Sequence, residues 1–222
     1  MARPPKVDHS TANLAADRAR ALALVPVSRE TAARLDRFVA LLLQWQAKTN
    51  LIAPSTVSTI WTRHIADSLQ LLALAPDAKC WVDLGAGAGF PGLVIACALA
   101  NTVGARVHLV ESNAKKAAFL RQAARQIGAP ALAHVVRIED FVKNFKERPD
   151  VVTARALAPL EVLLELAGPI LKTGAKGLFP KGQDVDAELT QASKCWSMDV
   201  ELVPSKTNSR ARIVVVRGLR WR

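Results

Sequence analysis

The stretch VDLGAGAGFPG, residues 82–92, carries glycines at a spacing typical of sites for nucleotide-like ligands. Gly85, Gly87 and Gly89 alternate, and the segment from Gly87 to Gly92 also fits the pattern G-x-G-x-x-G. Glycines let the backbone approach a ligand, and the start of the following helix offers unpaired N–H groups. A dinucleotide, a phosphate and a ligand without phosphate could all use such a turn.

Neighbouring residues narrow this choice of ligand. No Lys-Ser or Lys-Thr pair follows the glycines, which excludes a P-loop. Pro91, after Phe90, removes an N–H where a dinucleotide fold would hold a pyrophosphate. Glu111 ends the second predicted strand, and a carboxylate there suits the two hydroxyls of a ribose, a group that NAD and S-adenosylmethionine share. The turn therefore favours a ligand that has no phosphate at that point.

Alternating strands and helices from Cys80 onward must position this turn. The predicted strands are CWVDLG, ARVHLVE, AHVVRIED, DVVTARAL, AKGLFPKG, MDVELVPS and ARIVVVRGL. The predicted helices are PGLVIACALA, NAKKAAFLRQAARQIG, APLEVLLELAGPIL and DVDAELTQASKCW. This alternation indicates an α/β fold with a mostly parallel seven-stranded sheet and helices on both faces. Only the turn KTNSR separates the last two strands, so we expect an antiparallel hairpin at the sheet edge.

Residues 1–76 have a different pattern, which predicts a tail and a helical cap. Residues 1 to about 9 are expected to be a loose tail. A helix with one apolar face follows, with Ser28 as its N-cap. The apolar face consists of Leu35, Phe38, Val39 and Leu42. A second helix is expected from near Ser55 to Pro76, and residues 77–222 are expected to form one compact domain.

The 222-residue chain is basic, with 30 Lys and Arg against 19 Asp and Glu, a formal net charge of +11 and a pI near 10.1. This balance favours a polyanionic partner, most often nucleic acid, with solubility alone as the alternative. Cys80, Cys97 and Cys195 form no C-x-x-C pair and indicate reduced structural thiols. The amino terminus lacks a secretory signal, and the longest apolar run, residues 93–100, is too short to span a bilayer. We therefore expect a cytoplasmic protein with no membrane partner.

Five alternating strands followed by an antiparallel pair are typical of the Rossmann-like class I methyltransferases. A nicotinamide dehydrogenase would normally add a second nucleotide-binding half or a catalytic domain, for which this chain is too short. The topology thus favours S-adenosylmethionine as the cofactor, bound by a methyltransferase domain over residues 77–222. A nicotinamide or flavin oxidoreductase and a non-catalytic nucleotide- or RNA-binding module are the alternatives.

A series of short motifs links the chain to a known family. In order they are NLIA (50–53), RHIADSL (63–69), DLGAGAGFPG (83–92), LVESNAKKAAFL (109–120), RIED (137–140), VVTARAL (151–157) and PKG (180–182). On these residues the chain resembles the RsmG (GidB) family, bacterial methyltransferases that modify guanine N7 in 16S ribosomal RNA. The resemblance covers about residues 35–216. The departures are mild: Ala86 replaces a small hydroxyl residue, Lys115-Lys116 replaces Lys-Arg, and Pro180 replaces an apolar residue.

The resemblance implies a cofactor site at the carboxyl ends of the strands. Its members would be Gly85, Gly87, Phe90, Glu111, Ile138, Glu139 and Arg155. The glycines would clear space for the methionine part, and Ile138 and Glu139, at the end of the third predicted strand, would contact the adenine. Core packing is the alternative for Phe90, a surface charge for Glu111 and Glu139, and an internal salt bridge for Arg155.

The target base and the RNA backbone would be held by further polar residues. Candidates near the base are Arg63, His64, Asp67, Ser68 and Lys181, the first four of which share helical spacing. A hydrogen-bonded cluster between cap and sheet would explain those four equally well. Candidates for the RNA backbone are Lys115, Lys116, Arg121 and Arg125, on one basic helix that could also be a solvated face.

The implied reaction asks little of the side chains. Guanine N7 carries a free lone pair at neutral pH, so an in-line methyl transfer needs alignment and desolvation but no general base. The expected partner is 16S ribosomal RNA, within the small subunit or its precursor, and the expected state is a monomer. The four histidines show no metal-ligand spacing, so no metal is implied.

Overall fold

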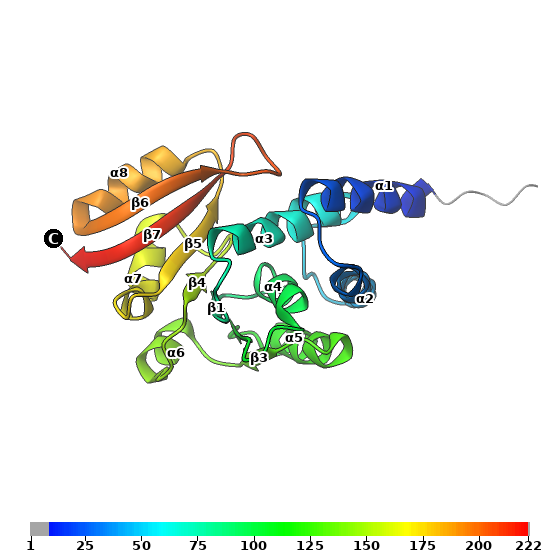
Figure 1. Ribbon diagram of the computed structural model, residues 1–222, viewed down its shortest axis with the longest axis horizontal. Coiled ribbons are helices and arrows are strands. Elements are labelled where there is room, and N and C mark those ends of the chain that lie inside the picture. The colour runs from blue at the N-terminus through cyan, green and yellow to red at the C-terminus, as the bar shows by residue number, and fades with distance from the viewer. Residues whose placement is uncertain (1–8, 222) are drawn as a thin grey trace, which may run out of the picture.

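A seven-stranded sheet in the order β3-β2-β1-β4-β5-β7-β6 organises the computed structural model, which describes residues 9–221 (Figure 1). Its strands are β1 (Cys80–Leu84), β2 (Arg106–Val110), β3 (Ala131–His134), β4 (Val151–Thr153), β5 (Lys176–Lys181), β6 (Trp196–Pro204) and β7 (Arg212–Trp221). Strands β1 to β5 are parallel, and β7 runs antiparallel to both β5 and β6. The predicted fold class and the carboxyl-terminal hairpin are therefore confirmed.

Alternate residues of the strands face two separate apolar layers. Trp81 and Leu109 belong to the core on one face, and Val82 and Val110 belong to the core on the other. Because both faces are covered, the central strands are apolar throughout, as expected for a buried parallel sheet. The apolar residues in β1 and β2 are consistent with this burial on both faces.

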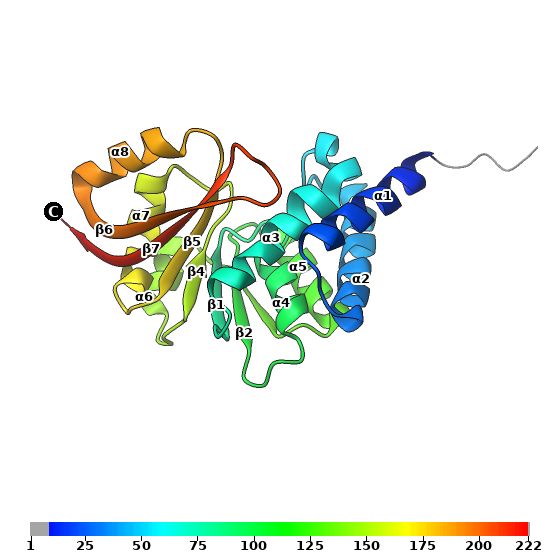
Figure 2. The same ribbon diagram turned by 45° about the horizontal axis from the view of Figure 1, so that its top comes forward.

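Helices cover both faces of the sheet (Figure 2). They are α4 (Gly92–Leu99), α5 (Ala114–Ile127), α6 (Ile138–Asn144), α7 (Leu160–Leu171) and α8 (Val185–Cys195). The first two contribute to the core that contains Trp81, and the last three contribute to the core that contains Val82. Helix α5 begins where the Asn113 side chain accepts the N–H groups of Lys115 and Lys116, and it ends at Gly128 in the left-handed region, as predicted.

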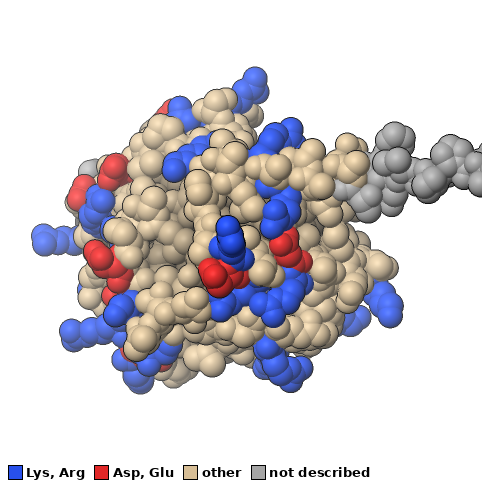
Figure 3. All heavy atoms as spheres, turned by 45° about the vertical axis from the view of Figure 1, so that its right-hand side comes forward, with Lys and Arg blue, Asp and Glu red and all other residues tan. Residues whose placement is uncertain are grey.

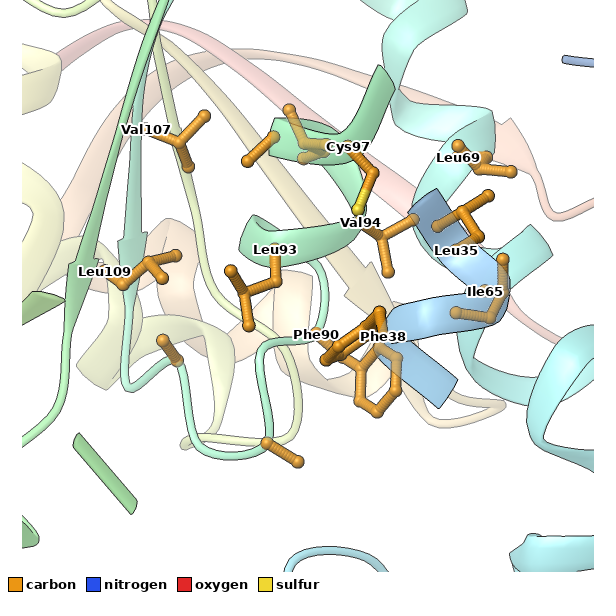
Figure 4. Close-up of a cluster of buried hydrophobic side chains, with 14 of the residues drawn as sticks. Leu35, Phe38, Ile65, Leu69, Phe90, Leu93, Val94, Cys97, Val107 and Leu109 are labelled. Carbon is orange, nitrogen blue, oxygen red and sulfur yellow. The ribbon is translucent and has the colours of Figure 1, made fainter. Parts of the chain in front are cut away.

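The amino-terminal helices pack on the α4–α5 side of the sheet, at the end of the molecule away from the β6–β7 hairpin (Figure 2). They are α1 (His9–Leu24) and α2 (Arg29–Gln46), and the Ser28 side chain accepts the Thr31 N–H as the predicted cap. Figure 4 shows Leu35 and Phe38 of α2 meeting Leu93 and Val94 of α4 in one apolar cluster. The helical cap and the sheet thus share a continuous core.

The second helical region begins at Pro54 and ends at Leu74, close to the predicted bounds, but it is not one regular helix. It consists of η1 (Pro54–Thr59), a π-helical turn η2 (Trp61–Ala66), α3 (Asp67–Leu69) and η3 (Gln70–Leu74). Asp17, buried on α1, accepts the N–H groups of Trp61 and Thr62 and so interrupts the helical hydrogen-bond ladder. This irregular segment presents the RHIADS residues to the sheet.

Two predicted strands are too long: β4 ends at Thr153, so Arg155 follows the strand instead of ending it, and the third predicted strand also runs past its observed end. Strand β3 ends at His134, and Ile138 and Glu139, expected at the end of a strand, instead open helix α6. Acidic residues in the first helical turn, Glu139 and Asp140, are favoured there by the helix dipole. The predicted loose tail, residues 1 to about 9, lies almost entirely outside the described residues. No helix within residues 9–221 has the length and apolar character needed to cross a membrane.

Candidate cofactor and RNA site

The glycine turn joins β1 to α4, and a side chain at Gly85, Gly89 or Gly92 would meet a neighbouring residue at less than 3.0 Å. Gly85 has a φ of +71°, and a Cβ there would lie 2.8 Å from the Leu157 Cδ1. Gly92 donates its N–H to Asp83 Oδ2 at 2.8 Å, and a Cβ on Gly92 would meet Leu109 at 2.3 Å. Asp83 is fully buried, and this burial raises its pKa to about 7. The turn is thus held by close packing and by the hydrogen bond from Gly92 to the Asp83 carboxyl group.

A cavity of about 630 Å³ opens beside this turn at the carboxyl ends of the parallel strands. All seven residues predicted for the cofactor line it: Gly85, Gly87, Phe90, Glu111, Ile138, Glu139 and Arg155. Ile138 and Glu139 reach it from the first turn of α6, which starts beside the sheet edge, so the wrong strand assignment leaves their location unchanged. This volume falls within the range of small-molecule sites.

Glu111 is held at the rim of this first cavity by two backbone groups. Its Oε2 accepts the Gly87 N–H at 3.0 Å, and its Oε1 accepts the Asn113 N–H at 2.7 Å. Each carboxylate oxygen has a second acceptor position. The side chain is therefore oriented by the turn and can still accept hydrogen bonds from a ligand.

Arg155 lies between the first cavity and a second one of about 450 Å³, and it lines both. Its Nε forms an ion pair with Asp67 Oδ2 at 3.2 Å, and its Nη2 donates to the backbone oxygen of Arg63 at 3.0 Å. Its Nη1 is buried and has no partner among the described residues. The internal salt bridge considered for Arg155 is present, and a free donor remains beside it.

Cations and the carboxyl-terminal hairpin surround the second cavity. Arg63, Asp67 and Lys181 line it, as do Asn208 and Arg212 from the hairpin. Arg210 and Arg212 are among the carboxyl-terminal arginines that could extend an RNA footprint or be only solubilising, whereas Ser205 and Asn208 had no predicted role because the hairpin and the cap are far apart in the chain. The basic turn KTNSR was the only signal in the sequence.

Asp67 and Lys181 are both engaged by neighbouring groups. Asp67 Oδ1 accepts hydrogen bonds from Thr207 Oγ1 at 2.7 Å and from Gln70 Nε2 at 2.9 Å. Lys181 Nζ pairs with Glu188 at 2.7 Å and donates to the Ala158 oxygen at 2.6 Å. The hydrogen-bonded cluster considered for RHIADS is therefore real, and it is built around Asp67.

His64 is the only residue of that element that lines the first cavity. Its ring stacks on Phe90 with centroids 4.8 Å apart, its Nε2 is 2.9 Å from Thr56 Oγ1, and its Nδ1 is buried without a partner among the described residues. Burial, with the charges of Arg155 and Arg63, lowers the pKa of His64 to about 3. The ring is thus neutral at pH 7. Phe90 both packs in the core and borders the cavity.

Ser68, predicted as a residue near the target base, lines neither cavity. The side chain is fully buried, and its Oγ donates to the His64 backbone oxygen at 2.6 Å. Serine hydroxyls on helices commonly bond the carbonyl one turn earlier, and the spacing of four residues from His64 allows this bond here. The helical spacing indicates that Ser68 and His64 share one face of the helix, but it does not determine where the Ser68 hydroxyl points.

The basic residues of α5 differ in their surroundings. Lys115, Arg121 and Arg125 are exposed, whereas Lys116 is half-buried and lines the first cavity. On the face shown in Figure 3, Lys and Arg side chains are more numerous than Asp and Glu side chains, which lie in smaller patches between them. Leu51 and Ile52, from the motif NLIA, also line the first cavity and had no predicted role.

Comparison with solved structures shows which known fold the chain shares. An O-methyltransferase from Bacillus cereus, solved in complex with SAH, superposes with a TM-score of 0.58 at 14% identity, covering 94% of this chain and all of that one. The fold is thus that of the Rossmann-like methyltransferases, with its cavity at the carboxyl ends of the parallel strands.

Comparison of sequences defines the family. The family model GidB, rRNA small subunit methyltransferase G, matches residues 31–214. A ribosomal RNA small subunit methyltransferase G of Bradyrhizobium sp. is 62% identical over 203 residues, covering 91% of each chain. One of Nitrobacter hamburgensis is 62% identical over 200 residues, covering 90% of this chain and 77% of its own.

The chain belongs to the GidB family of rRNA small subunit methyltransferases. The predicted family, the enzyme class and the cofactor S-adenosylmethionine are therefore confirmed. The oxidoreductase and the non-catalytic module have no support from these comparisons.

Proposed function

We propose that this protein transfers a methyl group from S-adenosylmethionine to N7 of a guanine in 16S ribosomal RNA, without a general base. The observation that carries the proposal is the pair of adjoining cavities that share Arg155 and residues 156–158. One cavity contains the glycine turn and Glu111, and the other is bordered by Arg63 and Lys181. A cofactor in the first and a nucleotide in the second would meet at Arg155.

The residues of the first cavity fit the cofactor in three ways. Bare backbone at the glycine turn admits close approach, and Glu111 offers carboxylate acceptors suited to ribose hydroxyls. Ile138 and Leu51 supply apolar surface suited to an adenine ring. The unpartnered Nη1 of Arg155 supplies a buried cationic donor suited to a carboxylate or a base oxygen.

S-adenosylmethionine supplies, when bound, a methyl group on a positively charged sulfur. The chain's own residues have the tasks of binding, orientation and exclusion of water. His64 stays uncharged at pH 7 because its pKa is about 3, so it places no added cation beside the methyl donor. Both carboxylate oxygens of Asp67 are already engaged, by Arg155, Gln70 and Thr207, so this carboxylate is not placed to act as a base toward a nucleotide. Guanine N7 needs no such base, and this agrees with the side chains available.

Several further roles belong to the same proposal. Arg63 and Lys181 would contact the target nucleotide from the second cavity. Lys115, Arg121 and Arg125 would contact the RNA backbone through the exposed side of α5. We further propose that the substrate is the small ribosomal subunit or its precursor, and that the protein acts as a monomer in the cytoplasm.

Calorimetric binding tests the cofactor site first. Wild type, Gly85→Asp and the control Gly104→Asp are titrated with S-adenosylmethionine and, separately, with NADH. Gly104 has the same positive φ, but a Cβ there has nothing within 4 Å, so this control adds a carboxylate away from the cavity. We expect wild type and Gly104→Asp to bind S-adenosylmethionine and Gly85→Asp to lose this binding. Binding that survives in Gly85→Asp would refute the proposed position of the cofactor.

Methylation of RNA tests the substrate. Purified 16S RNA and small subunits from cells lacking the endogenous enzyme are incubated with labelled S-adenosylmethionine, and the product is cleaved chemically at 7-methylguanine. A single cleavage at a guanine is expected. Label incorporated without cleavage would place the methyl group on another atom and refute the N7 assignment.

A further inference from the structure

A cluster of metal-ligating side chains lies on the sheet face covered by α6, apart from both cavities. Cys80 starts β1, His108 lies on β2, and Glu147 lies in the connection between α6 and β4. The Cys80 Sγ, a His108 ring nitrogen and a Glu147 carboxylate oxygen all lie within 4.8 Å of one another. None of the three lines either cavity, and the proposed methyl transfer uses none of them.

His108 has an unused nitrogen in this cluster. The side chain is 2% exposed, and its Nδ1 is 3.0 Å from the Nε2 of His134. Its Nε2 is buried without a hydrogen-bond partner among the described residues, and it lies 3.6 Å from Glu147 Oε1. If Nδ1 carries the proton and donates to His134, the Nε2 of His108 presents a bare lone pair to Glu147. Histidines that bind metals typically donate a hydrogen bond from the other ring nitrogen, which fixes the tautomer, and His134 is placed to accept such a bond here.

The remaining two groups complete a mixed donor set. Cys80 is 8% exposed, and burial, together with the Glu147 charge, raises the pKa of its thiol. Glu147 is 41% exposed at its side chain, and Arg106 binds its Oε2 at 3.1 Å, which leaves Oε1 directed toward His108. Sulfur, imidazole nitrogen and carboxylate oxygen are together the ligands that zinc accepts, with a tetrahedral spacing of about 3.3–3.8 Å between ligand atoms.

We propose that Cys80, His108 and Glu147 bind one divalent transition-metal ion, with Zn²⁺ the best match, and that a water molecule occupies the fourth position. Binding releases the thiol proton of Cys80 to solvent as the metal–sulfur bond forms. Glu147 reaches the ion by a small movement of an exposed side chain. The ion ties the connection after α6 to strands β1 and β2.

Cobalt spectroscopy tests this site directly. Untagged protein, freed of metal with a chelator, is titrated with Co²⁺ and then with Zn²⁺. A thiolate-to-cobalt charge-transfer band that saturates at one equivalent, and that Zn²⁺ abolishes, is expected in wild type. The control Cys195→Ser, which removes a half-buried thiol on α8, is expected to keep the band.

Two variants make the test specific. Cys80→Ser is expected to lose the charge-transfer band. Because this change could disturb the start of β1, a second variant, Glu147→Gln, alters the partly exposed ligand and its ion pair with Arg106, and it is expected to weaken cobalt binding by about tenfold or more. Absence of saturable binding in wild type, a band that persists in Cys80→Ser, or unchanged affinity in Glu147→Gln would overturn the proposal.

Discussion

The neutrality of His64 leads to a measurable dependence of stability on pH. Burial holds the pKa of His64 at about 3 in the folded protein, against an ordinary value of 6.5. The unfolded chain therefore takes up a proton as the pH falls below 6.5, and the folded protein does not. A histidine with a lowered folded pKa contributes stability above its unfolded pKa, and that contribution is lost as the pH falls toward the folded pKa.

The size of the effect follows from the pKa difference. At about pH 5 the pH lies about 1.5 units below the pKa of the histidine in the unfolded chain. At about 1.36 kcal/mol per unit, protonation then stabilises the unfolded state by about 2 kcal/mol. The folded histidine, with a pKa of about 3, is still almost wholly neutral at that pH. Wild type should therefore lose about 2 kcal/mol from this one side chain between about pH 7 and about pH 5.

Urea unfolding of wild type and His64→Gln at these two pH values isolates the contribution. Glutamine does not titrate, so groups common to both chains, Asp83 included, cancel in the difference between them. The control Phe90→Leu removes the ring that stacks on His64 but keeps the histidine, so it should lower stability and retain most of the wild-type pH dependence. If wild type and His64→Gln lose stability in parallel, His64 is not held neutral, and its assignment as an uncharged cavity residue is wrong.

Three other changes test single contacts of the site. Glu111→Gln should weaken S-adenosylmethionine binding about tenfold or more in calorimetry, because hydrogen bonds to a charged acceptor are worth about 1.5–3 kcal/mol; unchanged affinity would exclude Glu111 from the ribose site. Asp67→Asn removes the carboxylate that lies 3.2 Å from the Arg155 guanidinium. The free energy of unfolding, measured with urea, should fall by about 3 kcal/mol, and a fall of less than about 0.5 kcal/mol would mean that the ion pair is solvent-exposed. Arg121→Ala with Arg125→Ala should lower the slope of log affinity for RNA against log salt by about 1.5, and an unchanged slope would make this side of α5 a solvated face.

The elements that depend on neighbours in the chain were predictable from the sequence. The strand–helix alternation, the Ser28 and Asn113 caps and the Gly128 terminus arise from contacts within a few residues. The backbone of the glycine turn belongs to the same group, because Gly85, Gly87 and Gly89 adopt the positive φ that glycine favours. The family motifs then linked this local pattern to a cofactor.

The ends of the strands and helices and the directions of side chains were less predictable. Each depends on a contact that competes with the local sequence pattern. Ile138 looked like the continuation of an apolar strand, yet pairing with β2 ends at His134 and an acidic first turn starts α6. Ser68 shares helical spacing with His64, but its hydroxyl turns back to the chain instead of toward the cavity.

By itself, the sequence determined the fold class, the family and the seven cofactor-site candidates that line the first cavity, since these follow from short-range patterns and recognisable motifs. Only the tertiary structure decided which groups meet: Arg155 with Asp67, Asp67 with Thr207 of the hairpin, and Cys80 with His108 and Glu147. The physical reason is chain separation. Charges and donors far apart in the chain are brought within bonding distance by the packing of cap, sheet and hairpin, and no local spacing encodes their final distances.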